Sequence, residues 1–153
     1  MVADSIEREI TIAAPRARVW EVLTQPEFLG SWFGTGAPAL IDPRPGGRIL
    51  LDHGAHGPLL ALIERLDPPA VFAFRWSQGP AGEDPADGTS TLVTFTLSTE
   101  PGDHTRLRMV ENGFASLAFP REAVRTRFDR NGTGWTRKLT ELACHTERLT
   151  LRR

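Results

Sequence analysis

The opening of the chain changes its hydrophobic period within a few residues. Between Ile6 and Ile12, isoleucines recur on one side while glutamate and threonine recur on the other, a spacing that predicts a strand with one apolar face. Pro15 follows, and the fixed φ and missing N–H of proline suit the first position of a helix. Val19 and Leu23 then lie at helical spacing. We therefore predict a strand that passes directly into a helix.

The middle of the chain is dominated by strand patterns separated by glycine- and proline-rich turn signals. A short second helix is expected to start at Pro26 and to end near Gly30. The strands predicted after it are Ala39–Ile41, Arg48–His53, Pro58–Leu66, Val71–Trp76, Ser90–Ser98 and Thr105–Glu111. Their mostly short connections favour an antiparallel meander, which the first strand must join to avoid standing alone.

The last part of the chain, from Pro120 onward, has helical periodicity. Glycines within the 131–134 segment interrupt this pattern, and each costs about 1 kcal/mol relative to alanine inside a helix. Either the helix breaks there or it continues with a local bend. Phe128, Asn131 and Trp135 stay in phase across the glycines, so we favour a nearly continuous helix.

These elements predict an α+β fold with the order β-α-α-β6-α in one domain that spans residues 1–153. A seven-stranded antiparallel sheet with one apolar face is expected to pack against the long C-terminal helix. Two short helices accompany them. The curl of such a sheet would leave a space against the helix.

Composition narrows the class of protein. The net charge of -1 excludes nucleic-acid binding driven by bulk electrostatics. No apolar run approaches the roughly 20 residues needed to span a bilayer, so no membrane association is expected. The single Cys144 excludes an internal disulfide and fits a reducing, cytoplasmic setting. Tyrosine is absent, so the aromatic side chains favour apolar packing over hydrogen-bonding catalysis.

Several segments, in this order and at this spacing, resemble the START-like (SRPBCC) superfamily. They are Ile12–Trp20, Trp32–Phe33, Glu111–Phe114 and Gly134–Trp135. The most similar branch is that of the activator of heat-shock-protein-90 ATPase, C-terminal-domain type. The resemblance extends over nearly the whole chain, and it implies a helix-grip fold with a hydrophobic cavity between helix and sheet. No cofactor is expected.

Strand parity places three polar side chains in phase with the apolar interior face: Arg8, His53 and Glu111. The first and last strands are neighbours in the implied fold, so Arg8 and Glu111 could pair inside the cavity or form an ion pair at its rim. The candidate wall residues are Trp32, Phe33, Phe74, Trp76, Phe95, Met109 and Trp135. The residues Trp32, Phe33 and Trp135 fit a lid or wall of the cavity and fit ordinary core packing as well.

Three functions from different classes remain. The favoured one is non-enzymatic binding of a small hydrophobic or amphipathic ligand, oriented by Arg8, His53 and Glu111. The second is a cyclase- or hydrolase-type enzyme that uses His53 with Glu111 as an acid–base pair. The third is a chaperone-interacting protein, which predicts a large exposed apolar patch. A homodimer is a further open alternative.

Other chemistry is poorly supported by the sequence. His53 and His56 flank one turn, but zinc needs three or four ligands within tetrahedral reach, so no metal site is predicted. Cys144 and His145 are adjacent in the last helix, where consecutive side chains point about 100° apart. A cysteine–histidine nucleophile pair is therefore not expected.

Overall fold

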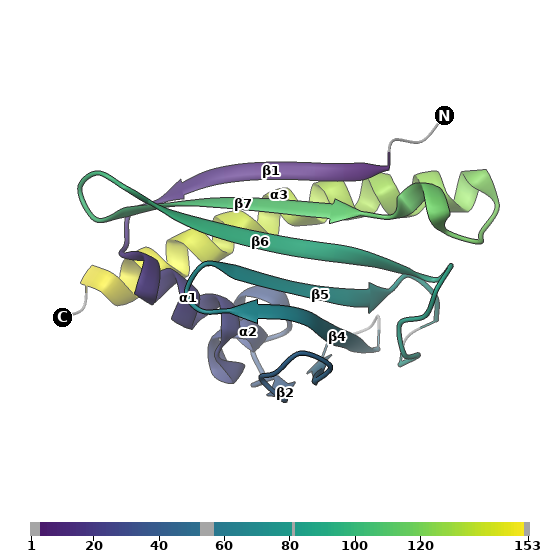
Figure 1. Ribbon diagram of the computed structural model, residues 1–153, viewed down its shortest axis with the longest axis horizontal. Helices are drawn as coiled ribbons and strands as arrows, with labels where there is room; N and C mark the ends of the chain where they lie inside the picture. Colours follow the sequence, from purple (N-terminus) through teal and green to yellow (C-terminus); the bar gives the residue numbers. More distant parts are fainter. Residues whose placement is uncertain (1–3, 53–56, 81, 152–153) are drawn as a thin grey trace.

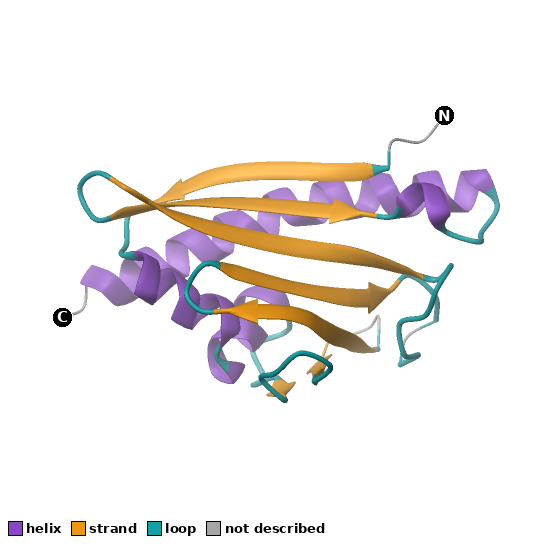
Figure 2. Ribbon diagram, in the orientation of Figure 1, coloured by secondary structure: helices purple, strands orange, loops and turns teal. Residues whose placement is uncertain are grey.

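The computed structural model describes residues 4–52, 57–80 and 82–151 and has an α+β, helix-grip-like architecture (Figure 1). The strands are β1 (Ser5–Ile12), β2 (Leu40–Ile41), β3 (Arg48–Asp52), β4 (Pro58–Asp67), β5 (Val71–Ser77), β6 (Ser90–Glu100) and β7 (His104–Asn112). The helices are α1 (Arg16–Thr24), α2 (Pro26–Phe33), the short 3₁₀ helix η2 (Phe114–Ser116) and α3 (Arg121–Leu151). Figure 2 shows α3 running along one face of an open sheet.

The seven strands form one antiparallel sheet in the order β1-β7-β6-β5-β4-β3-β2. The meander from β2 to β7 and the pairing of the first strand with the last confirm the predicted topology. In this register Ile6 lies opposite Glu111, and Arg8 lies opposite Met109. The sheet remains open, because β1 and the two-residue β2 are its edges.

The predicted interior face of the sheet is confirmed. Of the apolar residues that strand parity places on this face, only Ile10 is partly exposed, and the others are buried: Ile12, Ile49, Leu51, Phe72, Phe74, Trp76, Val93, Phe95, Leu97, Leu107 and Met109. Burying one such side chain contributes about 1.5–3 kcal/mol. Aromatic rings fill the centre between sheet and helices, where the centroid of Phe33 lies 5.9 Å from that of Phe74 and 5.7 Å from that of Trp135.

The C-terminal helix is continuous, as favoured from its periodicity. A single helix runs from Arg121 to Leu151 through both glycines. Gly132 is buried where α3 approaches β1, and a Cβ at this position would lie 3.3 Å from Nη2 of Arg8. The same Nη2 donates a hydrogen bond to the carbonyl of Gly132 (3.1 Å). The glycine therefore permits a close contact between helix and edge strand.

Gly30 in α2 allows a second close approach. The chain after α2 folds back over this helix, and the amide of Ala39 donates to the carbonyl of Pro26 (2.9 Å). A Cβ on Gly30 would lie only 1.9 Å from the backbone oxygen of Ala37. Backbone cannot rotate away as a side chain can, so the loop after α2 would have to move.

We predict opposite effects of alanine at two helical glycines. Gly30→Ala should lower the free energy of unfolding by about 2–3 kcal/mol through overpacking. Gly134→Ala should raise it by about 0.5–1 kcal/mol, because a Cβ there meets only Nζ of Lys138 at 3.8 Å and alanine is the better helix former. Urea unfolding of both variants measures the difference. Equal changes in the free energy of unfolding, with the same sign in both variants, would contradict the close packing at α2.

Candidate functional site

The carboxylate of Glu111 lies at the centre of a buried hydrogen-bond network. Its side chain has 0% exposed surface. Oε1 accepts a hydrogen bond from Nε1 of Trp135 (2.8 Å). Oε2 accepts from Nε1 of Trp76 (2.7 Å) and from Oγ1 of Thr91 (2.6 Å). The amide Nδ2 of Asn131 lies 3.3 and 3.1 Å from the two oxygens. Both carboxylate oxygens are thus fully engaged.

The donors come from both layers of the fold. Trp76 and Thr91 face each other across β5 and β6, and Glu111 follows on the adjacent β7. Asn131 and Trp135 are four residues apart on α3, so their side chains share one face of the helix. One carboxylate therefore links three neighbouring strands to the long helix.

Burial raises the pKa of the Glu111 carboxyl above its ordinary value, because the charged form loses its hydration. Hydrogen bonds from Thr91, Trp135, Trp76 and Asn131 lower the pKa, since they stabilise the charge, but they do not cancel the effect of burial. Indole and amide N–H groups can only donate. The site is therefore built to surround a hydrogen-bond acceptor.

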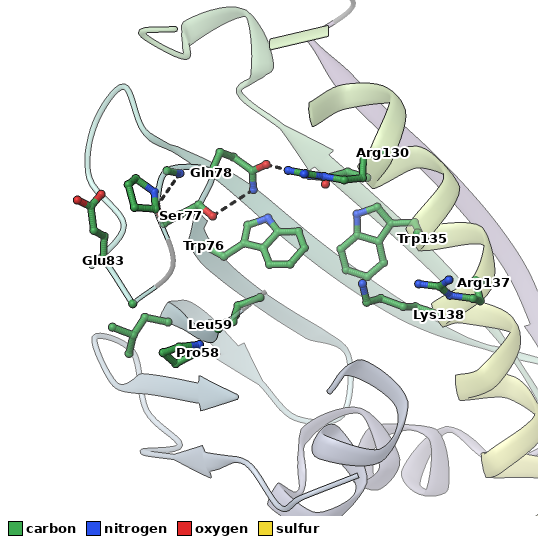
Figure 3. A pocket seen from close by; sticks show the side chains of 17 residues that line it. Pro58, Leu59, Trp76, Ser77, Gln78, Glu83, Arg130, Trp135, Arg137 and Lys138 are labelled. Atoms are coloured by element: carbon green, nitrogen blue, oxygen red, sulfur yellow. Dashed lines mark hydrogen bonds between the residues drawn. The ribbon is translucent and has the colours of Figure 1, made fainter. Parts of the chain in front are cut away.

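A pocket of about 360 Å³ opens beside this network, between α3 and the ends of β4 and β5 (Figure 3). Its apolar lining includes Leu59, Trp76 and Trp135. The two indole rings lie beside each other with centroids 5.7 Å apart. Asn131 also lines the pocket, whereas Glu111 does not. The pocket thus contacts three of the carboxylate's donors, with the carboxylate itself outside its lining.

The helix side of the pocket carries three cations, Arg130, Arg137 and Lys138. Lys138 is the only lysine in the chain. Its Nζ lies 5.2 Å from the ring centroid of Phe33 and 6.0 Å from that of Trp135, within cation–π distance. Burial lowers the pKa of Lys138, and the neighbouring Arg137 lowers it further, whereas Glu111 and Glu141 raise it.

The expected pairing of Arg8 with Glu111 is wrong. The guanidinium of Arg8 donates instead to the carbonyls of Glu7 (2.9 Å) and Gly132 (3.1 Å) and to Oγ1 of Thr136 (3.3 Å). Arg8 lies on the edge strand, two register positions away from the residue opposite Glu111. It lines a separate, open depression beside α3. β1 and β7 are neighbours as predicted, but their register does not bring the side chains of Arg8 and Glu111 together.

The remaining predicted site residues divide into three groups. Trp76 and Trp135 line the pocket. Five others are buried in the aromatic centre and are not among the pocket's lining residues: Trp32, Phe33, Phe74, Phe95 and Met109. His53 and His56 lie outside the described residues. In the part of the chain that is described, no three histidine, cysteine or acidic side chains gather as a possible metal site.

Sequence reasoning missed several residues of the site. Thr91, Gln78 and Asn131 complete the polar network: Nδ2 of Asn131 also donates to Oε1 of Gln78 (3.1 Å). Asn131 could have been found, because it is in phase with Phe128 and Trp135 on the buried face of the helix. Thr91 and Gln78 carried no such signal, since their role depends on strand register and on the path of a loop.

Residues 13–147 match the family described as Activator of Hsp90 ATPase homolog 1-like protein. The chain belongs to this family. The match extends over most of the sequence and confirms the resemblance inferred from its motifs. No curated protein matches the chain.

Solved structures share the fold. Protein MLL2253 from Mesorhizobium loti has a TM-score of 0.76 and 26% identity, over 94% of this chain and 97% of that one. Protein NE0264 from Nitrosomonas europaea has a TM-score of 0.74 and 19% identity, over 95% of each chain. The Aha1 dimer from Colwellia psychrerythraea has a TM-score of 0.71 and 20% identity, over 96% and 97%. The Colwellia protein is a dimer, and a homodimer of the present protein stays an open alternative.

We predict that Glu111→Gln lowers the free energy of unfolding by about 2 kcal/mol, because it places an amide N–H₂ against the indole and amide N–H groups, which can only donate. The effect should depend on pH. Folding raises the pKa of Glu111, so the native state holds this proton more tightly than the unfolded chain does. The contribution of Glu111 is then largest below its unfolded pKa and declines as the pH rises through the folded pKa.

Urea unfolding at several pH values measures this effect. The stability difference between wild type and Glu111→Gln should narrow as the pH rises through the raised pKa. Glu141→Gln, at an exposed position of α3, is the matched control. A difference that widens over this range would contradict the raised pKa of Glu111.

Proposed function

We propose that this family member binds one small hydrophobic or amphipathic molecule in the pocket beside Trp76 and Trp135, without performing chemistry on it. The observation that carries the proposal is a pocket of about 360 Å³ in which two indoles form an apolar wall and polar and charged side chains form the rest of the lining. Ligand sites are typically concave, mostly apolar and roughly 300–1,000 Å³ in volume. The proposal treats residues 1–153 as one ligand-binding domain.

The hydrogen bonds to Glu111 support this proposal, because they hold the pocket wall in place. Trp76 and Trp135 each donate their indole N–H to the same carboxylate. A wall that is already ordered loses little conformational entropy when a ligand binds. Apolar contact would then supply affinity at roughly 25 cal/mol per Å² before the costs of association.

Binding is favoured over catalysis by the position of Glu111. An acid–base mechanism needs a carboxyl group within reach of the substrate, but Glu111 has both oxygens engaged and is not among the pocket's lining residues. Its proposed partner His53 lies outside the described residues. The ligand-binding proposal uses Glu111 only to orient the indoles.

Binding is also favoured over a chaperone-docking role. Among the described residues the large apolar side chains that are exposed are Leu40, Leu50 and Leu151. Leu40 and Leu50 are partners across β2 and β3, while Leu151 lies at the end of α3. A docking surface would need a larger continuous apolar area.

No helix in the described part of the chain is long and apolar enough to cross a membrane.

We expect that filling the pocket from α3 will weaken binding. Gly134 lines the pocket, and beyond its two chain neighbours and the adjacent helix backbone a Cβ there would meet only Nζ of Lys138 within 4 Å. Gly134→Leu should therefore occupy part of the pocket and weaken binding of the neutral fluorophore N-phenylnaphthylamine about tenfold. Gly134→Ala, which adds one methyl group, should weaken it by less than about threefold.

Fluorescence titration measures both affinities, and thermal unfolding verifies that each variant is folded. Native mass spectrometry of the purified wild type, before any probe is added, tests for a copurified ligand. Binding to Gly134→Leu with wild-type affinity, or no binding of the probe to the wild type, would overturn the proposed function.

A further inference from the structure

The cations around the pocket differ from the arginines of the sheet surface. Arg65, Arg75, Arg106 and Arg108 each form a salt bridge with a carboxylate. Within residues 4–52, 57–80 and 82–151, no carboxylate forms a salt bridge with any of the three pocket cations, Arg130, Arg137 and Lys138. The one acidic residue in the lining, Glu83, comes from the loop across the pocket (Figure 3). The helix side of the pocket therefore has an excess of positive charge.

Lys138 is the most constrained of these cations. Its side chain is only partly exposed, and the ammonium lies against the rings of Phe33 and Trp135. Its Nζ makes no hydrogen bond to any described residue. An ammonium has three donors, and a partly buried one gains most from a charged acceptor, because charge-assisted hydrogen bonds are about twice as strong as neutral ones.

The position of Lys138 places its positive charge next to the aromatic wall of the pocket, which Trp76 and Trp135 form. Trp135 and Lys138 are three residues apart on α3, so both side chains face the same pocket. Figure 3 shows the ammonium beside the Trp135 ring, with Arg137 next to it. A molecule whose ring system contacts Trp76 and Trp135 would therefore bring a substituent at its edge to Nζ.

We propose that the ligand is an amphipathic anion: a ring system lies against Trp76 and Trp135, and a carboxylate, sulfonate or similar oxyanion pairs with Lys138. This inference rests on the proposed function, because it concerns the same pocket. It adds a class of ligand, and it assigns Lys138 as the residue that selects for negative charge. Arg137 also lines the pocket and adds to its positive potential.

Two fluorophores with the same rings test this inference. Anilinonaphthalenesulfonate carries a sulfonate, and N-phenylnaphthylamine is the same molecule without it. Lys138→Gln should weaken binding of the sulfonate about tenfold and change binding of the neutral probe by less than about twofold. Arg125→Gln, at an exposed position of α3 outside the pocket lining, should leave both affinities unchanged.

A second variant at the same position shows whether the effect of Lys138→Gln comes from the lost charge or from a loss of fold. Lys138→Met retains an aliphatic contact with the rings of Phe33 and Trp135 and removes the charge, so it should reproduce the selective loss. Added salt should weaken sulfonate binding to the wild type more than neutral-probe binding. Gly134→Leu should weaken both probes, which would locate them in the pocket.

The outcomes separate this inference from the proposed function. Neutral-probe binding with no selective loss of the sulfonate in either Lys138 variant would overturn the ligand class and leave the binding pocket standing. An equal loss of both probes would make Lys138 a packing residue and also overturn the ligand class. Failure of the wild type to bind either probe would overturn both proposals.

Discussion

A carboxylate without exposed surface must be satisfied by donors, and in this fold the donors to Glu111 come from both layers. Two indoles, a threonine and an amide converge on its oxygens from β5, β6 and α3. Removing the acceptor would leave several buried donors unpaired, each at a cost of about 1–3 kcal/mol. The network therefore fixes where α3 lies on the sheet and how Trp76 and Trp135 are turned.

Glu111 and Lys138 have different roles at the site. The carboxyl group of Glu111 is enclosed and hydrogen-bonded, so it orients the pocket wall. The positive charge of Lys138 lies in the pocket lining and forms no salt bridge with a described carboxylate. Because Trp135 and Lys138 lie on one face of α3, a small rearrangement of α3 would move both side chains. The ligand preference that we propose thus depends on helix placement, and helix placement depends on Glu111.

Local patterns predicted the strands, the antiparallel meander and the long helix, because hydrophobic period and turn signals are properties of neighbouring residues. The pairing of the first strand with the last was implied by the family resemblance. Local patterns also placed Trp76, Trp135 and Glu111 on the interior. They did not predict the contacts of Arg8 correctly. Strand parity indicates which face of the sheet a side chain lies on, but it does not indicate which side chain of another strand is within reach. Thr91 and Lys138 were missed for the same reason: their contacts depend on register and helix position, which only the assembled fold determines.

The central claim is that one buried carboxylate holds both pocket indoles. Hydrogen–deuterium exchange of the indole N–H resonances in ¹H–¹⁵N NMR tests it directly. Trp76 and Trp135 should exchange as slowly as the most protected core amides, since breaking their hydrogen bonds requires opening of the sheet–helix core. Trp32 donates to the carbonyl of Val22 (3.0 Å) and provides an internal reference. Rapid exchange of Trp76 and Trp135, with Trp32 protected, would contradict the account.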